Sequence, residues 1–458
     1  MPGTMNTVML DRPAEEIQEP ATLPRLLQGI RPEGPLGLRS HLALHGPLPR
    51  VRTGGRRRGR EQAGAFIEDL ERSGLLGRGG AGFPAAVKMR AVAAAKGRAI
   101  VVGNGCEGEP ASMKDRTLIQ TLPHLIIDGG IIAAEAVGAD EVILAMCESS
   151  PESTDAITAA IEERGGEGSH SPNLRVAEVP SHYSAGQETA LVNHLGGGPS
   201  LPTFTPPRVF EKGISGRPTL VNNVETLAHI ALISRHGSRW FRQLGTPSQP
   251  GSSLVTLSGA VAHPGVYEIE TGSSLSSLIN AGGGATGPMR GALIGGYGGS
   301  WIAGEYLRGI ALSNEHLAPH GATLGAGVVH LLSDQACPVA ETASLARWMA
   351  GQSARQCGPC IHGLDALSEA LDQVASGAAP ARAGQRISRL ASLTARRGAC
   401  AHPDGAVRMI ISGIEAFETE FADHARHGHC EQCSREPELP VPHRPLNMPA
   451  PRGKEARR

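Results

Sequence analysis

The feature that most constrains the fold is a regular alternation of short apolar runs with helical stretches. Apolar runs at residues 99–103, 142–146 and 174–179 have the length of buried strands. Helical stretches at residues 122–137 and 156–163 separate them. Strands that alternate with helices predict an α/β fold with an open, mainly parallel sheet.

The pattern changes twice after this sheet. A Pro- and Gly-rich stretch at residues 196–217 predicts loops close to a site, and residues 221–227 predict the start of another helix. From Leu254 the order becomes strand, hairpin, strand and helix, which is the order of a small β-grasp unit. Apolar residues at helical spacing then predict a C-terminal helical bundle.

Composition and charge exclude two classes of protein. The net charge of −1 gives no global basic field for nucleic acid, and the basic run at residues 56–60 predicts only a solvated linker. No run reaches the roughly 18 apolar residues that a membrane span needs, and the N-terminus lacks the apolar core of a signal peptide. We therefore expect a cytoplasmic protein, which would reach the inner face of a membrane only through a partner.

A dense glycine loop, Gly77-Arg-Gly-Gly-Ala-Gly82, predicts a bound nucleotide or flavin. Without Cβ atoms, its backbone N–H groups can approach a phosphate or a planar ring. The alternative is a flexible linker, but Phe83-Pro84 and a helix that starts near Ala85 argue against it. The loop is not the Rossmann fingerprint, because it does not follow a strand with the spacing Gly-x-Gly-x-x-Gly.

An acidic loop follows the first predicted strand. Asn104-Gly-Cys-Glu-Gly-Glu-Pro110, with Lys114-Asp-Arg116 behind it, lies at the carboxyl end of that strand, where open α/β sheets bind ligands. Its carboxylates and amide can hold ribityl hydroxyls or a nicotinamide carboxamide. The alternative is a solvated acidic turn.

Five of the eight cysteines fall in the last quarter of the chain, at positions 357, 360, 400, 430 and 433. In a cytosolic protein such clustering favours metal or cluster ligation over disulfides. Cys147 and Cys337 are interpreted as buried, small apolar residues.

Four segments in this order resemble the flavoprotein subunit of respiratory complex I and its relatives in NAD-linked hydrogenases and formate dehydrogenases. They are the glycine loop continued to Pro84, the acidic loop, Tyr183-Ser-Ala-Gly-Gln-Glu-Thr-Ala190, and Val221-Asn-Asn-Val-Glu-Thr226. The resemblance runs from about residue 60 to about residue 425.

The resemblance implies three domains: a Rossmann-like FMN- and NADH-binding domain (61–240), a β-grasp domain of the soluble ligand-binding type (241–330), and an iron-sulfur-binding helical bundle (331–426). Before them, a segment rich in Pro, Gly and Arg predicts an extended or partly disordered arm (1–60). After them, we expect a disordered tail that contains cysteines (427–458).

The resemblance also assigns site residues. FMN and the nucleotide would be held by Gly77, Arg78, Gly79, Gly80, Gly82, Phe83, Lys88, Asn104, Glu107, Tyr183, Gly186, Glu188, Asn222 and Asn223. Glu109, which would face the nicotinamide, and Glu188 are the candidate catalytic residues, although hydride transfer to a flavin requires no side-chain acid or nucleophile. Cys357, Cys360 and Cys400 would ligate a 4Fe-4S cluster.

The nucleotide site departs from the family pattern at three positions. Cys106 replaces a carboxylate near the flavin, and Ala91 replaces an aromatic residue after the glycine loop. Arg208 replaces the phenylalanine that stacks on adenine in the family. A guanidinium can stack on adenine or pair with a ribose 2′-phosphate, so the two interpretations are a shift toward NADPH and a weaker or lost nucleotide affinity.

The cluster site departs at one position, because Ala354 replaces the first cysteine of the family's trio. The missing ligand could be water, a histidine such as His362 or His402, or one of Cys430 and Cys433. The last two form a second Cys-x-x-Cys, which could instead hold a separate zinc, be redox active, or have no role.

Two functions remain open at this point. The first is an NADH dehydrogenase-like enzyme that takes electrons from NADH or NADPH into FMN and passes them through the cluster to a partner. The second is a relay or scaffold subunit that exchanges electrons between FMN and a ferredoxin. The implied partners are an iron-sulfur subunit, a ferredoxin or a membrane reductase.

Overall fold

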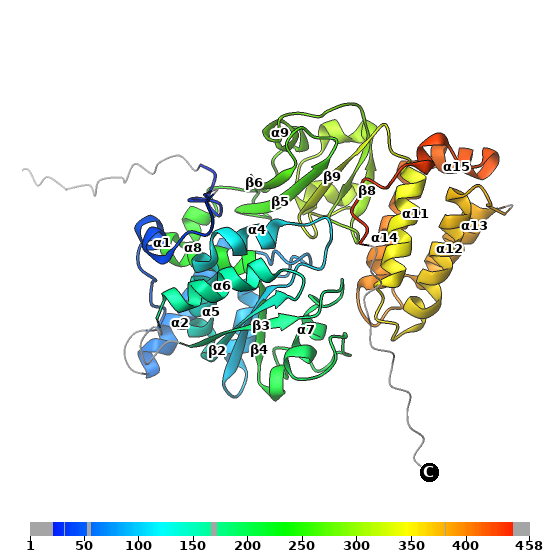
Figure 1. Ribbon diagram of the computed structural model, residues 1–458. Helices are drawn as coiled ribbons and strands as arrows, with labels where there is room; N and C mark the ends of the chain where they lie inside the picture. Colours follow the sequence, from blue (N-terminus) through cyan, green and yellow to red (C-terminus); the bar gives the residue numbers. More distant parts are fainter. Residues whose placement is uncertain (1–21, 32, 53–55, 166–171, 381, 443–458) are drawn as a thin grey trace, which may run out of the picture.

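The computed structural model describes residues 22–442, except residues 32, 53–55, 166–171 and 381. Figure 1 shows an α/β domain, a second domain around a mixed sheet, and a helical bundle packed beside the second domain. This order confirms the predicted fold class.

The first domain is built on a four-stranded parallel sheet with the order β3-β2-β1-β4. The strands are β1 (Ala99–Gly105), β2 (Ala139–Cys147), β3 (Asn173–Val179) and β4 (Thr219–Asn223). The helices are α2 (Arg56–Ser73), α3 (Ala85–Ala94), α4 (Lys114–Thr121), α5 (Pro123–Val137), α6 (Pro151–Glu163), α7 (Glu188–Leu195) and α8 (Val224–Phe241).

Strand β4 corrects the prediction of a helix from residue 221. Its short apolar run pairs with β1, where Gly103 lies opposite Asn222 and Asn104 opposite Asn223, and the helix begins only at Val224. Tertiary pairing has therefore overridden local helix preference. Strand β2 lies on one side of β1 and β4 on the other, so the strand order reverses at β1. In open α/β sheets the ligand-binding crevice lies at the carboxyl ends of the strands at such a point, here the ends of β1 and β4.

Helix α5 forms the centre of this domain, and every one of its residues is buried. A helix that is apolar on all sides must be covered on all sides. Helix α8 packs so closely against it that a Cβ atom at Gly129 would overlap the backbone of Leu227. This packing fixes the start of α8, and with it the end of β4.

The N-terminal region corrects the prediction of an extended arm, at least from residue 22. Helix α1 (Leu38–His45) packs on α5, and the His41 ring lies 2.8 Å from Asp128. The backbone N–H groups of Arg25 and Leu26 each donate to Glu268 of the second domain at 2.8 Å. The basic run at 56–60, predicted as a linker, forms the start of α2. Residues 1–21 lie outside the described part.

The second domain has a mixed sheet with the order β6-β5-β9-β7-β8. Its elements are β5 (Ser252–Gly259), β6 (Gly265–Glu270), α9 (Leu275–Ala281), β7 (Met289–Ile294), β8 (Ser300–Ala303), α10 (Asn314–Leu317) and β9 (Val328–Ser333). An antiparallel hairpin, a helix, and a return strand parallel to β5 agree with the predicted β-grasp unit.

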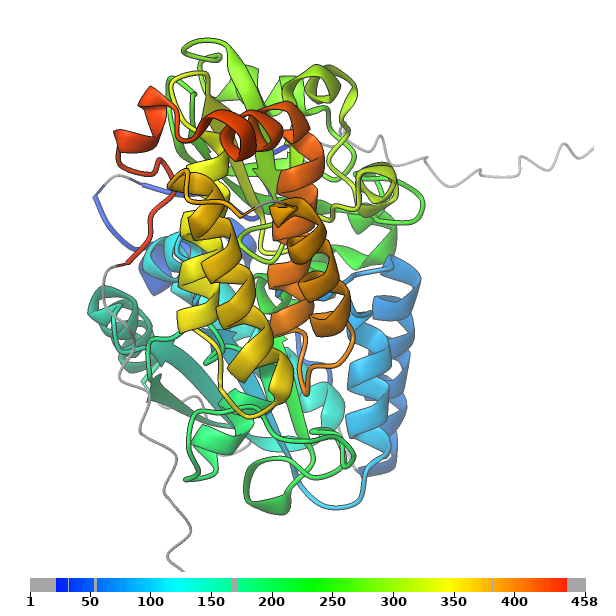
Figure 2. The ribbon, with the colours of Figure 1, turned by 90° about the vertical axis from the view of Figure 1, so that its right-hand side faces the viewer.

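The bundle contains α11 (Pro338–Gly351), α12 (Leu364–Ala375), α13 (Ala383–Thr394), α14 (His402–Ala416) and α15 (Glu418–His427). Figure 2 faces the bundle and shows α15 across one end of it. Among the described residues no single helix is long and apolar enough to span a membrane, and only the bent pair α4 and α5 meets the length and composition criteria.

The segment after α15 corrects the prediction of a disordered tail as far as residue 442. Leu439 is buried, and the Glu438 N–H donates to Glu341 at 2.6 Å. The hydroxyl of buried Tyr297 donates to the Pro440 carbonyl at 2.6 Å. The tail therefore runs back along the bundle to the second domain. Residues 443–458 lie outside the described part.

Candidate functional site

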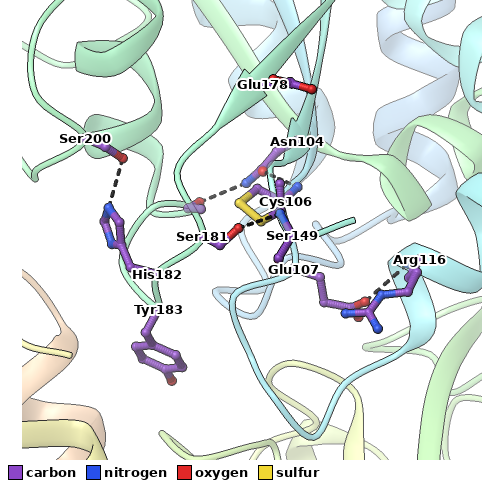
Figure 3. Close-up of a disulfide and its surroundings, with 12 residues drawn as sticks. Asn104, Cys106, Glu107, Arg116, Ser149, Glu178, Ser181, His182, Tyr183 and Ser200 are labelled. Atoms are coloured by element: carbon purple, nitrogen blue, oxygen red, sulfur yellow. Dashed lines mark hydrogen bonds between the residues drawn. A yellow bond between two sulfur atoms is a disulfide. The ribbon is translucent and has the colours of Figure 1, made fainter. Parts of the chain in front are cut away.

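The crevice at the ends of β1 and β4 gathers the motif segments. The Asn104 amide donates to the Gly186 carbonyl at 2.8 Å and accepts from the Cys106 N–H at 3.1 Å. A Cβ atom at Gly186 would come within 2.8 Å of the Cys106 carbonyl oxygen, so only glycine allows the two loops to lie this close. Figure 3 shows Asn104 and Tyr183 on these neighbouring loops.

The glycine loop closes on itself and on β4. The Gly77 N–H donates to the Phe83 carbonyl at 2.9 Å, and Gly79 packs against Asn223. Gly80 has φ of 103°, a conformation that favours glycine. Gly77, Gly80 and Gly82 line a cavity of about 20 Å³ together with Arg78 and residues of the second domain.

Arg78 points inward rather than toward open solvent. Its guanidinium is buried and donates to the Ser252 carbonyl at 2.8 Å, and it lies 3.9 Å from Glu225. Its backbone N–H donates to Thr226 at 2.9 Å. Arg78 thus joins the glycine loop to α8 and β5, and its positive charge is buried on the inner side of the loop.

The sequence analysis did not predict the buried ionic group that lies next to the glycine loop. Lys114 lies 2.7 Å from Asp115 and 2.9 Å from Glu225, and all three side chains are buried. Burial disfavours the charged form of Lys114, but the two carboxylates outweigh it and raise its pKa. Glu225 also accepts from the Leu254 N–H at 2.9 Å, so this group ties the first domain to the second. The sequence feature that could have revealed this group is the Lys114-Asp-Arg116 motif, whose residues were given no individual roles.

Lys88 and Glu188, both predicted at the flavin, form an ion pair of 2.8 Å. Lys88 also donates to the Val221 carbonyl in β4 at 2.9 Å. Glu188 is the first residue of α7, where a carboxylate is favoured by the helix dipole. The pair therefore joins α3, which follows the glycine loop, to two of the four motif segments.

The two acidic-loop carboxylates differ in role. Glu107 accepts from the N–H groups of Asp115 and Arg116 at 3.2 Å, so it caps the start of α4. Glu109 is buried and accepts from the Tyr297 N–H of the second domain at 2.8 Å. Burial raises the pKa of Glu109 to about 7, against the lowering effect of that hydrogen bond. Glu109 is thus the carboxylate that can change protonation state near neutral pH.

Tyr183 connects the crevice to the bundle. Its ring makes edge contacts with Trp348 and His402, at centroid distances of 5.4 and 5.5 Å. Its backbone N–H donates to the Gln352 side chain at 3.1 Å. In Figure 3 its ring points away from Cys106. Tyr183 therefore lies between the two predicted cofactor sites.

Asn222 and Asn223 test whether the crevice fits a flavin. The Asn223 amide donates to Asp115 at 2.7 Å and accepts from the Glu225 N–H at 2.9 Å, so it is occupied as the cap of α8. The buried Nδ2 atom of Asn222 has no hydrogen-bond partner among the described residues. A buried donor without an acceptor costs free energy. The carbonyl and hydroxyl oxygens of FMN supply the kind of acceptor that this donor lacks.

Phe83 and Arg208 are the non-glycine residues of the predicted set that are exposed. Phe83 is 47% exposed at the end of the glycine loop, where a planar ligand could cover it. Arg208 lies in the exposed loop before β4, and its N–H donates to Glu211 at 2.9 Å. Its side chain is therefore available to a nucleotide.

Cys106 and Cys147 form a disulfide, which corrects the interpretation of Cys147 as a plain apolar residue. They lie at the carboxyl ends of neighbouring strands β1 and β2, with Cα atoms 4.8 Å apart. The parallel pairing brings these two ends together, which spacing in the sequence does not reveal. Figure 3 shows the bond beside Asn104.

Cys357, Cys360 and Cys400 approach one another at the far end of α11. Burial, together with the neighbouring thiols of Cys357 and Cys400, raises the pKa of Cys360 to about 12. Cys357 and Cys400 are half-buried. Three converging thiols on short, irregular segments fit an iron-sulfur cluster, which is held by cysteine thiolates. Beside them, the Nδ1 atom of His402 is buried with no partner among the described residues.

Cys430 and Cys433 do not join this trio. They lie with Cys337 and His424, and the four ligand atoms are within 4.8 Å of one another. This placement corrects the interpretation of Cys337 as a plain apolar residue. The two cysteine groups stand at opposite ends of the 14-residue helix α11, which is about 21 Å long.

Comparison with known protein families matches all three units. Residues 70–232 match the Nuo51 FMN-binding domain, residues 254–296 the SLBB domain, and residues 340–424 the iron-sulfur binding region of NADH-ubiquinone oxidoreductase-F. Among curated proteins, the chain is 30% identical to the second F-type subunit of NADH-quinone oxidoreductase of Rhizobium meliloti (strain 1021), over 80% of this chain and 90% of that protein. The chain belongs to the NADH-quinone oxidoreductase F family.

Two further comparisons agree with this family membership. The F-type subunit of NADH-quinone oxidoreductase of Mycobacterium bovis is 31% identical over 80% of this chain and 85% of its own length. A chain of an NAD⁺-reducing [NiFe]-hydrogenase, crystallised in the H₂-reduced state, superposes with a TM-score of 0.74 at 29% identity. The match covers 81% of this chain but only 64% of the hydrogenase chain. The shared domain order therefore extends to a second kind of NAD-linked enzyme.

Proposed function

We propose that this chain is the electron-entry subunit of an NADH dehydrogenase-like complex. It oxidises NADH or NADPH at FMN and passes the electrons through an iron-sulfur cluster to a partner. The observation that carries the proposal is the pairing of Asn104 with Asn223 across β1 and β4, since it draws the motif segments of the oxidoreductase F family around one crevice. FMN supplies the ability to accept two electrons and release them singly.

The residues of the crevice have distinct parts in this proposal. The glycine loop and Lys88 hold the phosphate end of FMN, and Asn222 donates to the ring or the ribityl chain. Glu109 faces the nicotinamide and controls the charge there, because its pKa of about 7 lets it be neutral or ionised under working conditions. Tyr183 and the wall formed by Trp348 separate the crevice from the cluster and exclude water.

The cluster is assigned to Cys357, Cys360 and Cys400. Cys430 and Cys433 are not its missing ligands, because α11 separates them from the trio. His402 remains a protein candidate for the fourth position, since its Nδ1 atom lies buried next to Cys400 without a partner among the described residues. The partner would be an iron-sulfur subunit or ferredoxin. The protein would work in the cytoplasm or, through a membrane reductase, at the inner face of the membrane.

Anaerobic spectroscopy tests this proposal. The full chain is reconstituted with FMN, iron and sulfide, and NADH or NADPH is added while absorption and paramagnetic resonance are recorded. We expect the flavin absorbance to bleach and a cluster signal to follow. FMN that binds but is reduced by neither nucleotide would favour the relay subunit, and a chain that binds no FMN would overturn both.

Arg208 decides the choice of nucleotide in the same assay. If it pairs with a 2′-phosphate, Arg208→Ala lowers kcat/KM for NADPH about tenfold or more and leaves NADH nearly unchanged. Lys212→Ala is the matched control, because it removes another exposed positive charge from the same loop. Equal effects of the two substitutions would show a general charge effect and refute a specific contact.

A further inference from the structure

The end of the bundle opposite the cluster trio carries a second set of metal-type ligands. Cys337 precedes α11, and His424 lies in the last turn of α15. Cys430 lies just before the short helical turn Glu431–Ser434 that follows, and Cys433 lies within it. The Cys433 sulfur lies 3.3 Å from the Cys337 sulfur, 3.6 Å from the Cys430 sulfur and 3.2 Å from the His424 Nε2 atom. Four ligand atoms from three separate segments therefore converge on one point.

The spacing of these atoms fits a single ion. Zinc binds sulfur at about 2.3 Å and nitrogen at about 2.0 Å in a tetrahedron, which puts neighbouring ligand atoms roughly 3.5–3.8 Å apart. The observed separations, all within 4.8 Å, are of this size. In a 4Fe-4S cluster each thiolate binds a different iron, so the sulfurs surround the cluster instead of meeting at one point.

The orientation of His424 is also that of a metal ligand. Its Nδ1 atom lies 2.7 Å from the Glu420 carbonyl oxygen. Because a carbonyl can only accept, Nδ1 carries the proton, and Nε2 presents its lone pair to Cys337 and Cys433. A histidine whose other nitrogen is fixed by a backbone carbonyl is the usual arrangement in zinc sites.

Cys337 presents its sulfur at the start of a helix. It caps the N-terminus of the 14-residue helix α11, and its sulfur accepts from the Ala340 N–H at 3.4 Å. The backbone N–H groups and dipole of a helix start favour an anion. The site is buried on the Cys337 and His424 side and half-buried on the other, so an ion could enter from the tail side.

We propose that Cys337, His424, Cys430 and Cys433 form a structural zinc site, separate from the iron-sulfur cluster. Three thiolates and one imidazole complete a tetrahedron and leave no open position for a substrate, which is the mark of a structural rather than a catalytic zinc. The ion joins the start of α11 to the end of α15 and fixes the tail that continues to Pro440.

Metal analysis of the full chain tests the site. The protein is produced with both zinc and iron in the medium, and metals are measured by plasma mass spectrometry. We expect about one zinc per wild-type chain, lost in Cys433→Ser with iron unchanged. Cys360→Ser should do the reverse and lower iron while keeping zinc. His429→Ala is the matched control, since this exposed histidine lies next to Cys430 but outside the quartet, and it should keep both metals.

A measurement on the wild-type chain avoids dependence on variants that fail to fold. X-ray absorption at the zinc edge should give a first shell of sulfur with one lighter donor, and cobalt in place of zinc should show thiolate charge-transfer bands. A wild-type chain without zinc overturns the proposal, as does iron that disappears with Cys433→Ser or a Cys430–Cys433 disulfide in the freshly purified protein. Zinc that persists in both Cys433→Ser and His424→Ala would equally refute it.

Discussion

Replacement of Lys114 by methionine tests whether the buried ionic group holds the first two domains together. The substitution keeps an unbranched side chain only one atom shorter but leaves Asp115 and Glu225 without their shared cation. Removal of one partner from a buried ion pair typically costs about 3–5 kcal/mol. Glu225 retains Arg78 at 3.9 Å and the N–H of Leu254, so we expect the lower end, about 3 kcal/mol.

Lys88→Met provides the matched control in the same crevice. The side chains of Lys88 and Glu188 are 24% and 40% exposed, and such pairs contribute about 0–1 kcal/mol because water screens them. Urea unfolding of the flavin-free chain, followed by circular dichroism, measures both losses. The double variant Lys114→Met with Glu225→Gln should recover at least about 1 kcal/mol, since one of the two buried carboxylates that lost Lys114 is then neutral.

Two results would refute the reasoning. Equal losses for Lys114→Met and Lys88→Met would mean that burial does not decide the strength of these ion pairs. Strict additivity in the double variant would mean that Lys114 and Glu225 do not interact, whatever their 2.9 Å separation.

Three further predictions concern the crevice. The raised pKa of Glu109 means that the folded chain keeps a proton that the unfolded chain releases between pH 4.5 and about 7, so stability falls as pH rises through this window, by up to about 3 kcal/mol. Glu109→Gln should flatten the pH dependence of stability in urea titrations and also the pH profile of NADH oxidation. The pKa of Glu341 is also about 7, but Glu341→Gln should leave the pH profile of NADH oxidation unchanged. Asn222→Leu should stabilise the flavin-free chain by about 1 kcal/mol and weaken FMN binding roughly tenfold. If calorimetry showed that both stability and FMN affinity fall, Asn222 would not be a buried donor that lacks a partner in the flavin-free chain. Gly186→Ala should cost about 1–3 kcal/mol and release FMN, because its Cβ meets the Cys106 carbonyl; unchanged flavin content would show that the loops can separate.

The sequence predicted those parts of the fold that repeat or that carry local signals. Strands β1, β2 and β3 are apolar runs between helical stretches, and the β-grasp order is visible in its turns. Strand β4 was missed, because five residues that pair with β1 carry no periodic signal of their own and merge with the helix that follows. The tail was missed for a related reason, since Leu439 is an isolated apolar residue among prolines and charges.

The site shows a similar division. Motif resemblance found the segments, and the structure brings Lys88 to Glu188 and Asn104 to Gly186. Motif resemblance did not show that the side chains of Glu107 and Asn223 are occupied as helix caps, because a capping contact depends on where the next helix begins. No sequence pattern indicated the residues that approach from the second domain. Tyr297, for example, is 188 residues from Glu109 in the chain.

The contact between Tyr297 and Pro440 has a consequence for the order of synthesis. Tyr297 holds Glu109 through its backbone and the tail through its hydroxyl. On the ribosome, the glycine loop and the acidic loop emerge early, but the acceptor for this buried hydroxyl is made only when residue 440 has been translated. The contacts through Tyr297 therefore cannot be complete before Pro440 has emerged, and a chain cut short before Pro440 would carry the nucleotide motifs with the second domain's support incomplete.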